Sequence, residues 1–124
     1  KKERVWISSK YKSGSFLNGW SPPHPSTFIN KKIFIKFGKF KTKYKFAADT
    51  ELLYRFIEQK AVKTRYIPSF LVKMRLGGQS TKNYINIIKQ NLEIVSFLKK
   101  NKKFFLINFL FKKLMFKIFQ YKII

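Results

Sequence analysis

The sequence predicts an α/β fold, with short strands, two or three helices and a basic amphipathic helix at the C-terminal end. Residues 39–46, KFKTKYKF, alternate lysine with aromatic or hydroxyl side chains, which is the two-residue period of a strand. An extended loop with one solvated face fits the same alternation. Residues 81–99 instead repeat apolar side chains at helical spacing.

A helix at about residues 49–60 follows from the segment AADTELLYRF at 47–56. Asp49 is the only aspartate of the chain and stands where an N-cap or a first-turn acid belongs. Glu51 and Arg55 are four residues apart, a spacing that predicts an ion pair. The apolar stripe of this helix consists of Leu52, Leu53, Phe56 and Ile57.

The other segments are read from prolines, glycines and periodicity. Three prolines in residues 21–27 predict a rigid loop that presents His24. Residues 28–38 predict a short strand and then one or two helical turns that stop at Gly38. Residues 61–68 and 70–75 read as two short extended segments. The expected apolar face of the helix at 81–99 is Tyr84, Ile87, Ile88, Leu92, Val95 and Leu98.

Composition limits the classes of function. The 124 residues fit one small domain, and 45 % hydrophobic residues with fifteen Phe exclude a disordered basic tail. The absence of cysteine excludes disulfides, thiolate catalysis and cysteine metal sites, and a single histidine excludes a His-rich metal site. The net charge of +23 attracts phosphate backbones, anionic lipids or phosphorylated substrates without choosing among them.

The C-terminal segment differs from the rest. Residues 101–124 contain no acid and predict a basic amphipathic helix that binds an anionic membrane surface. The alternative is a helix that packs its apolar face on a larger protein. We therefore divide the chain into residues 1–100 and a tail at 101–124. No apolar run is long enough to cross a bilayer, no signal peptide is evident, and the start at Lys1 suggests a processed chain or a piece of a longer one.

Four pieces then stand in a recognisable order. They are GWSPPHPSTF at 19–28, FGKFKTKYKFAADTELLYRF at 37–56, YIPSFLVKMRLGGQS at 66–80, and the long helix. Their order and spacing over roughly residues 4–95 resemble the C-terminal half of bacterial family 2 glycosyltransferases. The resemblance implies the acceptor-side portion of a GT-A fold. It also implies transfer of a sugar from a nucleotide-sugar donor to the hydroxyl of a carbohydrate or lipid-linked acceptor, with inversion.

The resemblance also assigns roles to residues. Asp49 corresponds to the catalytic base, which takes the proton of the acceptor hydroxyl; a plain helix cap is the alternative. The expected substrate-binding residues are His24, Glu51, Arg75, Gly77, Gly78 and Ser80. For His24 the alternative is a hydrogen bond that fastens its loop, and for Glu51 it is support of the helix. For the 75–80 loop, expected near the donor diphosphate, it is a turn with a helix cap.

The chain also departs from the family. The family's nucleotide-binding half carries an Asp-x-Asp motif for a divalent metal, and one aspartate cannot supply it. We therefore expect that half to be absent, no cofactor or metal site in this chain, and Mg²⁺ or Mn²⁺ only in a full-length enzyme. Alone, the chain is expected to be inactive. Lys41 stands where the family often has an acid.

The expected location is the cytoplasm, peripheral at the inner face of the cell membrane, with a role in surface polysaccharide or glycolipid synthesis. The competing class is a non-enzymatic basic protein that binds nucleic acid or anionic membranes, because lysines interleaved with aromatics suit phosphates and bases. Under the transferase interpretation no nucleic acid is expected as a partner.

Overall fold

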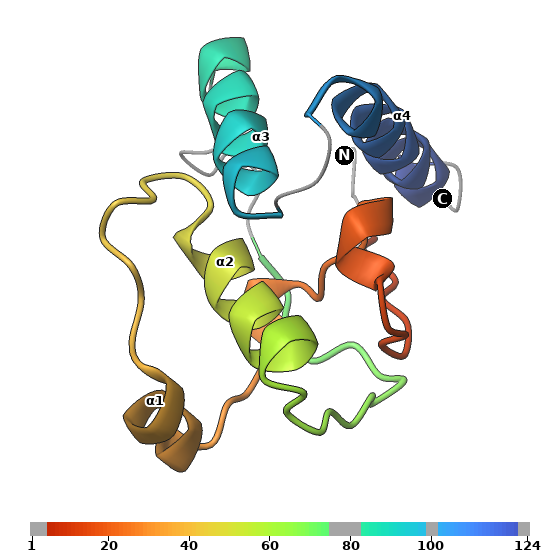
Figure 1. The fold of residues 1–124 in the computed structure, drawn as a ribbon. Coiled ribbons are helices and arrows are strands. Elements are labelled where there is room, and N and C mark those ends of the chain that lie inside the picture. Colours follow the sequence, from red (N-terminus) through yellow and green to blue (C-terminus); the bar gives the residue numbers. More distant parts are fainter. Residues whose placement is uncertain (1–4, 75–82, 99–101, 122–124) are drawn as a thin grey trace.

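The computed structural model describes residues 5–74, 83–98 and 102–121. Within these ranges the chain is helical (Figure 1). In chain order the elements are the 3₁₀ turns η1 (Ser15–Asn18) and η2 (His24–Ser26), α1 (Lys31–Phe37), α2 (Ala48–Tyr54), its π-helical continuation η3 (Arg55–Gln59), α3 (Tyr84–Leu98) and α4 (Lys102–Tyr121).

The α/β expectation is wrong for the part of the chain that the structure describes, because no strand or sheet occurs there. Residues 39–46, expected as a strand, turn instead, with the Tyr44 amide bonded to the Lys41 carbonyl at 3.2 Å. Residues 61–68 and 70–74 are irregular rather than paired strands. A strand is stable only beside another strand that satisfies its backbone groups, and the described residues place none there.

Two of the predicted helical segments are confirmed. The helix expected at about 49–60 is observed as α2 and η3 over residues 48–59. In the segment 28–38 the short strand is absent, but the helical turns form α1. The Asn30 side chain caps α1 by accepting from the Lys32 amide at 2.9 Å, and Gly38 ends it with φ +86°.

The core gathers where η1, α2, α3 and α4 meet (Figure 1). Phe16 and Tyr54 meet edge to face at 5.5 Å, and Tyr54 lies 5.6 Å from Phe97. Gly19 is the place where α4 comes closest to η1, because a Cβ there would lie 3.2 Å from the Lys113 backbone nitrogen. The buried cluster consists of Phe16, Ala47, Leu53, Ile57, Ile94, Phe97, Leu98 and Phe109.

The face that α3 buries differs from the one expected. Of the expected residues, Leu98 is buried and Val95 packs partly buried against the core, whereas Tyr84, Ile88 and Leu92 are exposed. The other buried residues of α3, Ile94 and Phe97, were not expected. Only the C-terminal half of α3 reaches the core, because its first turns extend beyond α2 (Figure 1). Helical spacing identified the helix but not which of its several apolar residues would meet α2 and α4.

The tail forms the expected helix, α4, over Lys102–Tyr121. Where its side chains are described, Phe109 is buried, whereas Ile107, Phe111 and Leu114 are exposed. None of the helices in the described ranges is long and apolar enough to cross a bilayer.

Candidate functional site around Asp49

The start of α2 is held by a carboxylate from another helix. The backbone amides of Lys45, Phe46 and Ala47 donate to Glu93 of α3 at 3.0, 2.9 and 2.9 Å. The Gln90 side chain donates to the Phe46 carbonyl at 3.1 Å. Burial acts to raise the pKa of Glu93, but these amides and the Lys45 charge outweigh it, so the pKa is lowered. Glu93 thus fixes the path by which the chain enters α2.

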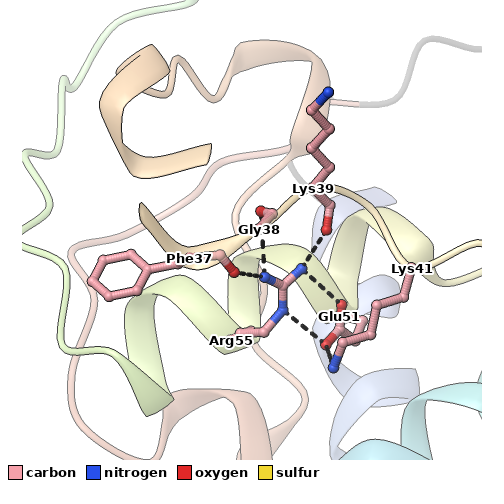
Figure 2. Close-up of polar contacts among 6 residues, drawn as sticks. All are labelled: Phe37, Gly38, Lys39, Lys41, Glu51 and Arg55. Carbon is pink, nitrogen blue, oxygen red and sulfur yellow. Dashed lines mark hydrogen bonds and ion pairs between the residues drawn. The ribbon is translucent and has the colours of Figure 1, made fainter. Parts of the chain in front are cut away.

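The next turn of α2 is fastened by a buried ion pair (Figure 2). Glu51 is 2 % exposed, and its Oε1 lies 3.1 Å from Nε of Arg55, as the i, i+4 spacing predicts. The Arg55 guanidinium also donates to the carbonyls of Phe37, Gly38 and Lys39, the last at 2.7 Å. Arg55 therefore ties the end of α1 to α2.

Lys41 completes this cluster from the solvent side. Its Nζ lies 2.8 Å from Glu51 Oε1, and its side chain is about half exposed. The residue that departs from the family pattern thus forms an ion pair with Glu51 (Figure 2). Both oxygens of Glu51 face these cations, an arrangement that favours support of the helix over substrate contact.

Asp49 lies in the first turn of α2, between the two anchors. Its side chain is half-buried, and Oδ1 accepts from the Thr50 amide at 2.7 Å and the Thr50 hydroxyl at 3.4 Å. Oδ2 has no hydrogen-bond partner among the residues the structure describes. Asp49 is not the N-cap, because Ala47 occupies that position without a side-chain cap. One carboxylate oxygen is thus held by Thr50, whereas the other is not held by any described residue.

Lys113 of α4 lies within the electrostatic reach of Asp49. Its Nζ donates to Asn91 Oδ1 at 2.6 Å. Burial, together with repulsion from Lys117, lowers the pKa of Lys113 to about 8, and attraction to Asp49 offsets part of that change. A partly desolvated amine therefore accompanies the candidate base, and the tail helix supplies it.

His24 lies in the proline-rich loop that precedes α1. It starts the 3₁₀ turn η2, and its ring meets Phe40 edge to face at 6.1 Å. The Nδ1 atom is buried and has no hydrogen-bond partner in the described part of the chain. Among the described residues, no hydrogen bond links His24 to Asp49.

The remaining sequence-predicted residues cannot be placed. Arg75, Gly77, Gly78 and Ser80 lie outside the described residues. In the ranges 5–74, 83–98 and 102–121 no three His, Asp or Glu side chains gather as metal ligands.

A shallow pocket lies at the far end of the same helix. Its volume is about 320 Å³, and Asp49 does not line it. The lining residues are Tyr11, Ser13, Ile57, Glu58, Ala61, Val62, Lys63 and Thr64. The pocket and the candidate base thus occupy opposite ends of α2 and η3.

Sequence reasoning missed the contributions of Glu93, Lys113 and Glu58. The signal for the two glutamates was the scarcity of acids, because each of the five acidic residues in a chain with 28 Lys+Arg is expected to have a partner. The signal for Lys113 was weaker, since the tail is rich in lysine and no local pattern marks which one faces inward.

Comparison with models of known protein families, with curated proteins and with solved structures finds no match to this chain.

Proposed function

We propose that this chain is a fragment of a glycosyltransferase that resembles family 2 and that Asp49 is its general base. The observation that carries the proposal is the segment AADTELLYR at 47–55, in its order with the proline–histidine and Gly-Gly-x-Ser segments. The proposal rests on this order of sequence segments, because the described residues are helical and Asp49 does not line the pocket.

The geometry around Asp49 supports this role. Glu93 holds the three amides before α2, and the Glu51–Arg55 pair fastens the turn after Asp49. Catalytic groups act best when their positions are fixed before substrate binds. A half-buried carboxylate with one free oxygen, on a helix fastened at both sides, meets that requirement.

In the proposed reaction Asp49 takes the proton from an acceptor hydroxyl. The hydroxyl oxygen forms a bond to the anomeric carbon of the donor sugar, and the bond to the nucleoside diphosphate breaks, so the diphosphate leaves with its electron pair. A positioned carboxylate contributes about 10²–10⁴-fold to such a step. Binding of the nucleotide is assigned to another part of the enzyme.

Asp49→Asn tests the assignment in the enzyme that contains this chain. The change keeps the shape of the side chain and removes its basicity, so transfer should fall about 10²–10⁴-fold. Transfer is measured as release of nucleoside diphosphate, and donor affinity should stay unchanged. Thr50→Val is the matched control, because it removes only the hydroxyl 3.4 Å from Asp49. Turnover of Asp49→Asn within tenfold of the unmodified enzyme would refute the assignment.

A second proposal concerns location, at the inner face of the cell membrane through α4. The observation that favours it is a stripe of exposed apolar side chains. Ile107, Phe111, Leu114 and Ile118 recur every three or four residues and are exposed. With lysines on the same acid-free helix, this stripe suits an anionic bilayer.

Vesicle flotation tests this second proposal. Replacing the four stripe residues by serine should abolish binding to vesicles that contain phosphatidylserine. Serine at Tyr84, Ile85, Ile88 and Leu92, an equal number of exposed apolar residues on α3, is the matched control and should bind as before. Equal binding by both variants would show that α4 is not the anchor.

A further inference from the structure

The pocket at the end of η3 contains an unusual carboxylate. Glu58 Oε1 accepts from the Gly14 amide at 2.7 Å and from the Ser13 hydroxyl at 3.5 Å. Oε2 is buried and has no hydrogen-bond partner among the described residues. A buried carboxylate oxygen without a partner is costly, so this one is an acceptor in want of a donor.

The chain around Glu58 is shaped by an unusual backbone turn. Ala61 has φ +49°, a left-handed conformation that residues other than glycine seldom adopt. The turn lets the Val62 amide reach back to the Phe56 carbonyl at 3.0 Å. It thereby folds residues 61–64 over the end of the helix and forms the pocket wall opposite Glu58.

The chemistry of the pocket favours a neutral ligand with several hydroxyl groups. The Glu58 carboxylate, at the negative end of the helix dipole, accepts hydrogen bonds, whereas the Lys63 ammonium group donates them. Hydroxyl groups both donate and accept, so they satisfy both kinds of partner. Lys63 and the strongly positive chain disfavour an organic cation.

The apolar part of the wall and the pocket size agree with this class. Ile57, Ala61 and Val62 form an apolar surface against which the C–H face of a sugar ring can pack. The volume of about 320 Å³ is at the low end of small-molecule sites. Burial raises the pKa of Tyr11, and the negative charge of Glu58 raises it further. The Tyr11 phenol also lines the pocket, where it can donate a hydrogen bond to a ligand.

We propose that the pocket lined by Glu58, Tyr11 and residues 61–64 binds a single neutral sugar ring, with Glu58 Oε2 accepting from a ring hydroxyl. Because Oε2 is buried in the free chain, the proposal requires side chains at the pocket to move when the sugar binds. Glu58 lies nine residues after Asp49, roughly 14 Å along the helix. That the bound sugar is a unit of the acceptor rests on the proposed function, whereas its binding does not.

The test is ligand-observed NMR of the chain with methyl β-glucoside and methyl α-mannoside as probes. The unmodified chain should bind at least one of them. Glu58→Gln keeps an oxygen for the Gly14 amide but replaces the free acceptor, so affinity should fall at least tenfold. Val62→Trp, which fills the pocket, should abolish binding, and Ile88→Trp on the exposed face of α3 is its matched control.

Asp49→Asn separates the two proposals. It should leave glycoside binding unchanged even where transfer is lost. A loss of binding in Asp49→Asn, or retained binding in both Glu58→Gln and Val62→Trp with unchanged circular dichroism, would overturn the pocket assignment. So would the absence of glycoside binding by the unmodified chain, or preferential binding of methylguanidinium.

Discussion

The helices α2 and α4 are both amphipathic, yet they are fixed in different ways. In α2 and η3 the apolar residues Leu52, Leu53, Phe56 and Ile57 are all buried, and Glu51 is paired with both Arg55 and Lys41. In α4 the described part buries Phe109 and turns most other apolar side chains outward. The first helix is therefore fixed by the fold, whereas the second presents much of its apolar surface to something outside it.

The difference shows how charge is used in a chain with few acids. Glu51 and Glu93 both stabilise the region around α2, the first through an ion pair and the second by accepting from backbone amides. Helix α4 has no acid of its own. It meets the rest of the chain through an exposed hydrogen bond from Lys112 to Asn18 at 2.7 Å, a hydrogen bond from Lys113 to Asn91, and the buried Phe109. Anchoring is thus concentrated around the candidate base.

The largest expected effect is on the anchored helix. Arg55→Met leaves Glu51 buried without its main partner and three carbonyls without a donor, so the free energy of unfolding should fall by about 3–5 kcal/mol. Urea unfolding followed by circular dichroism measures the loss. Lys41→Met, which removes the half-exposed partner, should cost less than about 1 kcal/mol. Equal losses of unfolding free energy in the two variants would contradict this expectation, because the buried Arg55 would then contribute no more than the half-exposed Lys41.

A smaller effect is expected at the entrance to α2. Glu93→Gln should lower stability by about 1–2 kcal/mol, because a neutral amide accepts less strongly from the three amides. The lowered pKa of Glu93 means that its contribution is present above the ordinary value of 4.5 and is lost as pH falls through the lower, folded-state value. Urea unfolding should therefore show a difference in stability between the unmodified chain and Glu93→Gln above pH 4.5 that shrinks as the pH falls below it. A difference in unfolding free energy that stays constant with pH would contradict this expectation.

The third effect is expected in α4, and it has the same pH sign as the effect of Glu93. The pKa of Lys113 falls from 10.5 to about 8 on folding, so the unfolded chain binds more protons between these values. Stability should therefore rise with pH from about 8 to 10.5, and Lys113→Met should flatten that rise. Unfolding midpoints across this range provide the measurement. Lys112→Met removes a charge from the same helix and should keep the slope; if it flattens the slope equally, the effect belongs to general charge.

The sequence by itself determined the local structure that depends on neighbours in the chain. Asn30 and Gly38 set the ends of α1, the apolar stripe from Leu52 to Ile57 made α2 and η3 a helix, and spacing of four paired Glu51 with Arg55. The amphipathic tail likewise formed α4. Hydrogen bonds and contacts three or four residues apart are encoded within one turn, so they can be read from one segment.

Only the tertiary structure decided what depends on distant partners. The alternation at 39–46 became a turn because Glu93, far along the chain, accepts from the Lys45 and Phe46 amides, and the described ranges place no strand beside the segment. The buried side of α3 and the inward turn of Lys113 were set by packing against α2 and η1. The free acceptor at Glu58 arose because residues 13 and 14 reached only one of its oxygens. These outcomes depend on which surfaces meet, and short-range periodicity carries no information about that.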